Sequence, residues 1–318
     1  MKTLSVIIPN YNHEVFLKQR IDSILQQRFI DFEIILLDDA SEDNSVSIIN
    51  HYRSHPKISH IIINSENSGS PFAQWQKGLA SATGKWIWIA ESDDIADPAF
   101  LETALEKLDQ QPDASFFYAD ASYLAAENDP APFQQYAAPK NRYFNTSRWS
   151  SDYAESGIGE INFCLKQACT VNNISSVVFR KSILEEAVQG TELFRFHGDW
   201  FCLLKAASRG NILYSGKTLN QFRMKTDSLL KGDDKLQSQQ EYFMILQWLM
   251  EQEFVSDKKE LLDYFVLNYC GYGLFADGPG YGKKLFRRYQ SINQQLATQV
   301  KSRLFRLKWS RKKRNSLF

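Results

Sequence analysis

The chain has 318 residues, of which 43% are hydrophobic and 14% aromatic, with 37 basic and 37 acidic side chains. This composition excludes a disordered protein, and the length allows one large domain or two smaller ones with ample core. Four cysteines without a CxxC pair argue against a zinc site or a disulfide framework and predict reduced core residues. We expect neither a signal peptide nor a membrane-spanning helix, because no run approaches roughly 18 apolar residues.

Strand-like and helix-like segments alternate in the amino-terminal third of the chain. Strands are predicted at 4–8, 32–37, 58–63 and 86–90, from short runs of β-branched and aromatic residues, and those at 32–37 and 86–90 are expected to be buried. Helices are predicted at 16–28, at 41–52 with Ser41 as the N-cap, and at 72–82. Successive strand–helix units of this kind predict an α/β fold with a parallel, right-handed, doubly wound sheet.

The remainder of the chain is more varied. A helix is predicted after Pro98, strands at 115–119, 175–179 and 212–214, a helix at 199–208, a long loop at 127–145, and helices beyond residue 228. We therefore divide the chain into a domain at 1–230, with halves at 1–110 and 111–230, and a helical extension at 231–318.

The carboxyl-terminal segment is strongly basic. Residues 283–318 hold 12 Lys and Arg and no Asp or Glu, which leaves 25 basic against 37 acidic residues elsewhere. Cations mixed with Leu304, Phe305 and Trp309 are typical of an amphipathic segment on an anionic membrane surface. A solvated tail is the alternative, and no recognition motif supports nucleic acid as the partner. We expect a cytoplasmic protein whose tail could attach it to the inner face of the cell membrane.

Polar clusters end three of the predicted strands, at Pro9–Asn12, Asp38–Asp43 and Glu91–Asp94. Because parallel strands end at one edge of a sheet, these clusters should converge. The three carboxylates of Glu91–Asp94 repel one another unless solvent or a cation neutralises them, and Mg²⁺ or Mn²⁺ holding a phosphate substrate would do so. A solvated acidic turn before the next helix is the alternative. No GxGxxG or GxxxxGK[ST] motif is present, which argues against a dinucleotide cofactor and a P-loop.

Taken in order, the motifs of this chain resemble family 2 of the glycosyltransferases, the inverting nucleotide-sugar enzymes with the GT-A fold. The matching pieces are Ser5–Asn12, Leu37–Asp43, Asn67–Gly69, Gly78–Gly84, Glu91–Asp94 and His197–Trp200. The resemblance covers about residues 3–230. It implies a GT-A-type, doubly wound, mostly parallel and Rossmann-like sheet with a C-terminal helical extension.

The resemblance also implies an activity and a set of site residues. The activity is inverting transfer of a sugar from a nucleoside diphosphate, usually UDP, to a glycan or lipid-linked acceptor in bacterial surface polysaccharide synthesis. Nucleotide-sugar binding is implied for Pro9, Asn10, Tyr11, Asn12, Asp38, Asp39, Ser41, Asn67, Gly69, Glu91, Ser92, Asp94, Arg223 and Lys225. Asp93, with Glu91, would hold Mn²⁺ or Mg²⁺, and Asp199 would be the catalytic base. The acceptor residues expected are Asn172, Asn173 and Trp200, with core packing as the alternative for Trp200.

Two positions depart from the family's pattern. The family usually has Asp in place of Glu91, and many relatives have His in place of Lys225, within an Arg-x-His-x-x-Ser run. A longer carboxylate still binds metal, and an ammonium group can neutralise phosphate directly. These departures leave a catalytically inactive nucleotide-sugar-binding subunit as one rival. A sugar-phosphate nucleotidyltransferase is the other, although it needs a glycine-rich basic loop that Pro9–His13 does not provide.

Overall fold

The computed structural model describes residues 2–124, 135–171, 173–223, 232–270 and 278–315. They form two compact units, each described here by itself. Unit 1 comprises Met1–Ile161, Cys169–Leu193 and Gly198–Asp227, and unit 2 comprises Asn162–Ala168, Phe194–His197 and Ser228–Phe318. The domain boundary predicted at residue 230 falls outside the described residues.

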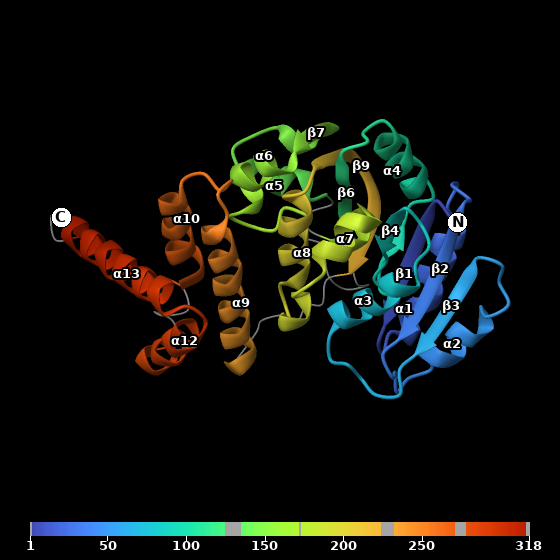
Figure 1. The fold of residues 1–318 in the computed structure, drawn as a ribbon, viewed down its shortest axis with the longest axis horizontal. Helices are drawn as coiled ribbons and strands as arrows, with labels where there is room; N and C mark the ends of the chain where they lie inside the picture. Colours follow the sequence, from blue (N-terminus) through green and yellow to red (C-terminus); the bar gives the residue numbers. More distant parts are fainter. Residues whose placement is uncertain (1, 125–134, 172, 224–231, 271–277, 316–318) are drawn as a thin grey trace. The chain divides into compact units, whose positions relative to one another are not determined.

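Unit 1 is built on a nine-stranded sheet (Figure 1). Its strands are β1 (Leu4–Asn10), β2 (Phe32–Asp38), β3 (Ile58–Ile63), β4 (Trp86–Ile89), β5 (Ile95–Ala96), β6 (Ala114–Leu124), β7 (Tyr153–Ser156), β8 (Val177–Arg180) and β9 (Asn211–Arg223). Their order is β3-β2-β1-β4-β8-β6-β9-β5, with β7 beside β9. Strands β1 to β4 pair in parallel, as do β6 and β9, whereas β8 is antiparallel to both β4 and β6. The predicted mostly parallel, doubly wound sheet is confirmed.

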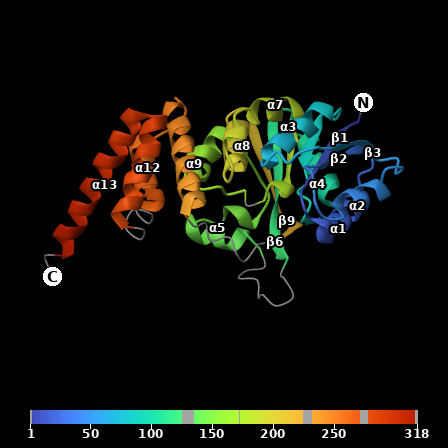
Figure 2. The same ribbon diagram turned by 90° about the horizontal axis from the view of Figure 1, so that it is seen from below.

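Helices cover both faces of this sheet (Figure 2). Their bounds are α1 (Glu14–Leu25), α2 (Ser45–His51), α3 (Pro71–Ser81), α4 (Phe100–Asp109), α5 (Ala137–Tyr143), α6 (Gly157–Glu160), α7 (Lys181–Ala187) and α8 (Gly198–Ala207). Side chains of α1, α2 and α4 share a core with Leu4, Val6 and Ile8 of β1. On the opposite face Ile7 lies against Gly78 of α3. A Cβ added at Gly78 would lie 2.4 Å from the Cγ2 methyl group of Ile7. Because successive residues of a strand face opposite sides, β1 separates these two helix layers.

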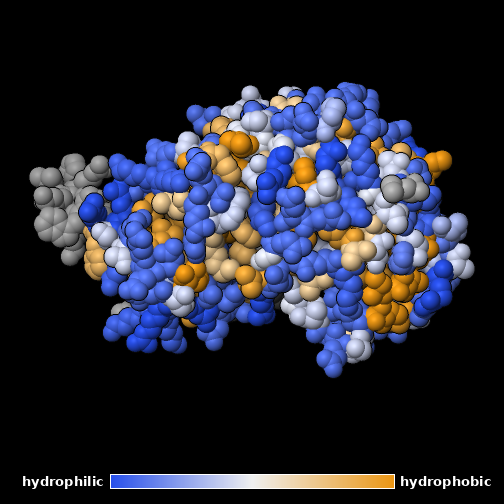
Figure 3. Space-filling model, in the orientation of Figure 1, coloured by the Kyte–Doolittle hydropathy of each residue, from blue (hydrophilic) through white to orange (hydrophobic). Residues whose placement is uncertain are grey.

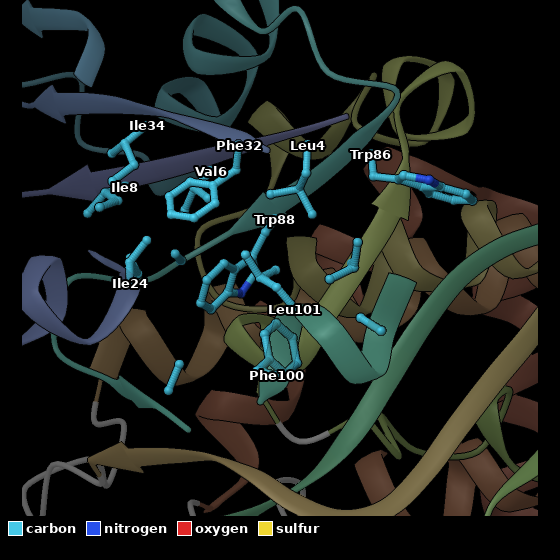
Figure 4. Packing of buried hydrophobic residues seen from close by; sticks show 14 of the residues in the cluster. Leu4, Val6, Ile8, Ile24, Phe32, Ile34, Trp86, Trp88, Phe100 and Leu101 are labelled. Atoms are coloured by element: carbon cyan, nitrogen blue, oxygen red, sulfur yellow. The ribbon is translucent and has the colours of Figure 1, made fainter. Parts of the chain in front are cut away.

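Aliphatic and aromatic side chains together fill the core between the sheet and α1, α2 and α4 (Figure 4). Trp88 of β4 packs on Phe100 of α4, with ring centroids 4.7 Å apart. Trp86 and Trp88 are both fully buried, which confirms their predicted core packing. Strand β3 stands at one end of the strand order and is therefore an edge strand of the sheet. Figure 3 shows an apolar area around β3 on a mostly hydrophilic face of the molecule.

Three local predictions need correction. Helix α2 begins at Ser45 rather than Ser41, because the Ser41 hydroxyl bonds to Asp38 across the strand end instead of capping the helix. Part of the loop predicted at 127–145 is helical, as α5 covers Ala137–Tyr143, and residues 125–134 lie outside the described residues. Strand β9 extends well beyond the predicted 212–214, because β5, β6 and β7 all pair along it.

Unit 2 is helical, as predicted, with α9 (Gly232–Glu251), α10 (Lys258–Phe265), α12 (Gly278–Ile292) and α13 (Gln294–Asn315). Among the described side chains of α12 and α13, Leu285, Tyr289 and Val300 are fully buried, whereas Phe305 is 60% exposed. The predicted amphipathic pattern is therefore present, and most of its described apolar residues are buried rather than exposed. In the parts of the chain that the structure describes, no helix is long and apolar enough to cross a membrane.

Candidate active site

The polar clusters that end β1, β2 and β4 converge at one edge of the sheet. Asn10 and Asp38 are partners in the register of β1 and β2, and Asn10 Nδ2 donates to Asp38 Oδ2 at 2.8 Å. The Ser41 hydroxyl donates to the same oxygen at 2.7 Å. After β4, the hydroxyl of Ser92 lies 2.7 Å from Nδ1 of His13. The parallel register therefore brings together residues that are far apart in the sequence, such as His13 and Ser92, which are 79 positions apart.

A cavity of about 330 Å³ opens at this edge. It is lined by eight of the predicted nucleotide-sugar residues: Pro9, Asn10, Tyr11, Asp39, Asn67, Gly69, Glu91 and Ser92. His13, Ser70, Pro71 and Gln74 complete the lining and were not anticipated. Asp38 is fully buried, so its carboxylate holds the rim together from beneath through Asn10 and Ser41.

The side chain of Asp39 organises the loop between β3 and α3. Its Oδ1 accepts hydrogen bonds from Asn64 Nδ2, the Ser68 backbone N–H and Gln74 Nε2, at 2.6, 2.9 and 2.8 Å. Its Oδ2 accepts one bond, from the Ser68 hydroxyl at 2.7 Å. A carboxylate offers about four lone-pair sites, two on each oxygen. Oδ2 therefore keeps capacity for a ligand donor.

Two turns shape the mouth of the cavity. Asn67 Oδ1 accepts the N–H of Gly69 at 2.6 Å, and Gly69 has a φ of +69° that other residues rarely adopt. Asn12, which also has a positive φ of 52°, accepts the N–H of Glu42 at 2.8 Å and so joins the β1 and β2 loops. Between these turns Tyr11 is 44% exposed, which leaves its ring open to a ligand.

The acidic turn after β4 is held by neutral donors on both sides. Glu91 Oε1 accepts from the indole Nε1 of Trp75 at 3.1 Å. Burial, together with Asp93 and Asp94, raises the pKa of Glu91 to about 8. Asp94 accepts from Asn173 Nδ2 at 3.0 Å, and burial raises its pKa as well. Asn173, predicted at the acceptor, thus belongs to the support of this turn.

A divalent metal fits part of this turn. No cluster of three or more His, Cys, Asp or Glu side chains that could hold an ion is found among the described residues. Glu91 nevertheless brings a carboxylate to the lining of the cavity, and Asp93 follows it two residues later in the same turn. Glu91 accepts a hydrogen bond from the Trp75 indole. Mg²⁺ is commonly bound by one or two carboxylates plus substrate phosphates. The pair fits an ion that is held jointly with a diphosphate.

Arg223, at the end of β9, lies under the acidic turn. Its guanidinium donates to the backbone carbonyl of Asp93 and to Gln19 Oε1, the latter at 2.8 Å, and packs over the ring of Phe16. In this arrangement Arg223 fixes the turn. Lys225 and Asn172 lie outside the described residues, so their expected roles stay predictions.

Asp199 lies in the first turn of α8, where its Oδ1 accepts the backbone N–H of Trp200 at 2.7 Å. A helix amino terminus favours a carboxylate. Gly198 packs on the ring of Phe72, next to the cavity residue Pro71, so the start of α8 lies beside the start of α3. Trp200 is only 4% exposed, so the structure favours the core-packing alternative over a contact with the acceptor.

Sequence reasoning missed several residues of the site. Gln74 and Trp75 lie within the helix predicted at 72–82, and a Gln on the face that also carries Gly78 is the signal of a polar site there. Arg20 was overlooked within the stripe of Leu17, Ile21 and Ile24, where a charged residue is the signal. His13 gave no signal, because a histidine after a turn is most often a surface residue.

The fold and the site define an α/β protein with an acidic cleft at the carboxyl ends of parallel strands. The sequence profile of the family described as "Glycosyl transferase family 2" matches residues 5–186, and the chain belongs to this family.

Curated relatives match over part of their length. TuaG of Bacillus subtilis (strain 168), named a putative teichuronic acid biosynthesis glycosyltransferase, is 30% identical over 127 residues, which are 40% of this chain and 50% of TuaG. Glycosyltransferase GlyG of Streptococcus pneumoniae serotype 4 is 33% identical over 108 residues, 34% of this chain and 36% of GlyG. The matches thus span between about a third and a half of these relatives.

Solved structures share the fold. Residues 1–349 of S. aureus TarS superpose with a TM-score of 0.68 at 16% identity, covering 96% of this chain and 88% of TarS. The same fragment in complex with UDP-GlcNAc gives a TM-score of 0.65 at 14% identity, with the same coverage. The mannosyltransferase PcManGT of Pyrobaculum calidifontis, in complex with GDP-Man and Mn²⁺, gives 0.54 at 13% identity, covering 96% of this chain and 87% of PcManGT. At these identities the likeness concerns the fold, and it confirms the GT-A architecture.

Proposed function

We propose that the chain transfers a sugar from a nucleoside diphosphate sugar, with UDP as the nucleotide, to a hydroxyl group of a glycan or lipid-linked acceptor. The observation that carries this proposal is the cavity at the strand ends, with Glu91 in its lining and Asp93 close to Glu91 in the same turn. TarS, which has the same fold, was solved with UDP, which supports a uridine nucleotide. The name of TuaG supports a role in bacterial surface polysaccharide synthesis.

The nucleotide would bind in the cavity through its base and ribose. Tyr11 is exposed at the mouth and would stack on the base. The open lone pair of Asp39 Oδ2 would accept a base N–H. The Asn67–Gly69 turn, which is bonded to the same carboxylate through Ser68, lines the cavity beside it. Asn10 lines the cavity and would contact the donor, and its hydrogen-bonded partners Asp38 and Ser41 would keep this rim rigid together with Asn12.

The diphosphate would lie beside the acidic turn. Glu91 and Asp93 would hold a divalent ion, Mn²⁺ or Mg²⁺, which supplies positive charge to a leaving diphosphate when it is bound. Asp94 and Asn173 keep the turn in shape, and Arg223 supports it from the carbonyl of Asp93.

Asp199 would act as the general base. Its carboxylate would take the proton from the acceptor hydroxyl as that oxygen attacks the anomeric carbon, while the diphosphate leaves from the opposite face. Attack opposite to the leaving group inverts the configuration of the sugar. A positioned base of this kind contributes about 10²- to 10⁴-fold in rate.

Hydrolysis of a panel of nucleotide sugars tests this function without knowledge of the acceptor. The wild type and Asp93→Ala would be assayed for nucleotide release with Mn²⁺, with Mg²⁺ and with a chelator, alongside binding of UDP. We expect metal-dependent release of UDP from one donor, lost in Asp93→Ala. UDP binding without release from any donor would favour the inactive binding subunit. A protein that binds no nucleotide would refute the proposal.

The basic helices support a second, separate proposal, which concerns location. Lys283, Lys284 and Arg287 of α12 are exposed, whereas Leu285 between them is fully buried and Phe286 is half-buried. Contact with an anionic membrane would therefore be electrostatic and would weaken as salt rises. Sedimentation with phosphatidylglycerol vesicles at low and high salt measures it. Equal sedimentation of wild type and a Lys283→Glu, Lys284→Glu, Arg287→Glu variant would argue against it.

A further inference from the structure

Arg20 occupies an unusual place in α1. Its side chain is fully buried on the stripe formed by Leu17, Ile21 and Ile24. Within the described residues, its Nε, Nη1 and Nη2 atoms have no hydrogen-bond partner, and the guanidinium lies 4.9 Å from the centre of the Trp88 ring. Burying a charged group without a partner is costly. Such a group calls for compensation from nearby charges.

The compensating charges are the carboxylates of the acidic turn. Asp94 acts most strongly on Arg20, followed by Asp93 and Glu91. Trp88, on which Arg20 stacks, lies three residues before Glu91 in the same chain segment. Burial lowers the pKa of Arg20 to about 10, so the guanidinium remains charged at neutral pH.

Arg223 adds a second guanidinium at the same turn, bonded to the Asp93 carbonyl. Among the described residues, Arg20 therefore interacts with Glu91, Asp93 and Asp94, and Arg223 with Asp93 and Asp94. The two guanidinium charges offset most of the negative charge of the turn, and the raised pKa of Glu91 lowers that charge further. A divalent cation alone would be attracted only weakly, because the two guanidinium groups repel it.

We propose that Arg20 is a fixed counter-charge of the Glu91–Asp94 turn and makes divalent metal binding depend on the donor diphosphate. This inference rests on the proposed function, because the diphosphate supplies the missing negative charge. Metal and nucleotide then bind cooperatively, and each tightens the other by the same factor. Arg20 acts through the turn and does not touch the donor, so it is a positioning residue.

The test is a binding cycle with Mn²⁺ and UDP. The free Mn²⁺ signal in electron paramagnetic resonance gives the Mn²⁺ dissociation constant with and without UDP. For the wild type we expect UDP to tighten Mn²⁺ binding at least about tenfold. In Arg20→Met, Mn²⁺ alone should bind roughly tenfold tighter than to the wild type, and the tightening by UDP should shrink by a similar factor. Arg20→Lys keeps the charge and should resemble the wild type.

Lys18→Met is the matched control, since it removes an exposed cation from the same helix and should leave both constants unchanged. Unchanged constants in Arg20→Met would overturn the inference. A loss of both affinities would also overturn it, because that is the result of a merely structural role. If circular dichroism shows Arg20→Met to be unfolded, Arg20→Gln takes its place with the same expectations. A wild type that binds no UDP refutes the proposed function itself, and that result is distinct from the other outcomes.

Discussion

The indole Nε1 of Trp75 donates a hydrogen bond to Oε1 of Glu91 at 3.1 Å. Trp75 lies on α3, and the rings of Trp75 and Phe72 meet edge to face with their centroids 5.0 Å apart. Phe72 in turn packs against Gly198, the first residue of α8. Helix α3 thus connects the acidic turn after β4 with the start of the helix that carries Asp199.

Glu91→Asp should lower activity even though it keeps the carboxyl group. The shorter side chain draws its carboxylate away from the Trp75 indole, which leaves a buried donor unpaired. We expect kcat/KM for donor hydrolysis to fall about tenfold, in line with the loss of about 1.4 kcal/mol of interaction. Trp75→Phe should cause a similar loss through the same bond.

Steady-state hydrolysis of the active donor measures both effects. Glu42→Asp, an exposed residue of the β2 loop, serves as the control and should change nothing. The double variant should be little worse than either single variant, because both remove one interaction. Fully additive losses would show that the two side chains act independently.

Asp39→Asn should loosen the loop before α3. The amide would present an N–H₂ group or a weaker acceptor to the donors of Asn64, Ser68 and Gln74. We expect UDP affinity to fall about 10- to 100-fold and the free energy of unfolding to fall by about 1–3 kcal/mol. Calorimetric titration with UDP and urea unfolding measure the two changes.

Ser68→Ala is the matched control for Asp39→Asn. It removes one of the four hydrogen bonds and keeps the carboxylate, so we expect only about 1 kcal/mol of lost stability and a smaller change in UDP affinity. Wild-type affinity for UDP in Asp39→Asn would remove this carboxylate from the nucleotide site.

Local patterns predicted the parts of the site that lie at strand ends. The β-branched runs before Asn10, Asp38 and Glu91 indicated buried strands, and parallel pairing is enough to place their ends at one edge. The same patterns could not separate Asp38 from Asp39. The two residues have the same chemistry, but the strand alternation turns the first beneath the rim and the second toward the cavity.

Contacts between elements that are distant in the sequence could not be predicted from local sequence patterns. The antiparallel insertion of β8 depends on pairing with β4 and β6, and no local signal distinguishes it from another parallel strand. The bond between Trp75 and Glu91 and the stacking of Arg20 on Trp88 likewise join different elements. The core position of Trp88 was predicted from the sequence and is confirmed. Its contact with the buried guanidinium of Arg20 could not be predicted, because it depends on how α1 packs against the sheet.

Gly198→Ala should impair catalysis more than donor binding. An added Cβ would lie 2.6–2.9 Å from three atoms of the Phe72 ring, so the start of α8 or the ring must shift. A displacement of about 1 Å at a catalytic group can cost about 10²-fold in rate. We expect kcat for donor hydrolysis to fall about 10- to 100-fold, with a smaller change in UDP affinity. Gly280→Ala, where nothing lies within 4 Å, should behave as wild type. A drop in UDP affinity as large as the drop in kcat would contradict the expectation that Gly198→Ala affects catalysis more than donor binding.

The environment of His197 in unit 2 predicts a loss of stability in acid. Its Nε2 lies 2.7 Å from the Ser238 hydroxyl, and its ring stacks on Tyr242 with centroids 4.1 Å apart. Burial lowers the pKa of His197 from 6.5 to about 4, although the nearby Glu241 carboxylate acts in the opposite direction. The unfolded chain therefore binds a proton between pH 6.5 and about 4 while the folded protein does not. In this range stability rises with pH, so it is lost as the pH falls.

His197→Gln removes this titration, and its effect is measured by urea unfolding at a series of pH values. Between neutral pH and pH ~4.5, the free energy of unfolding should fall by about 2 kcal/mol more in the wild type than in His197→Gln. Effects of other titrating groups are common to both proteins and cancel in this difference. Ser238→Ala keeps the imidazole and should retain the pH dependence of the wild type. Identical pH dependence in wild type and His197→Gln would show that His197 is protonated to the same extent in the folded and unfolded chains.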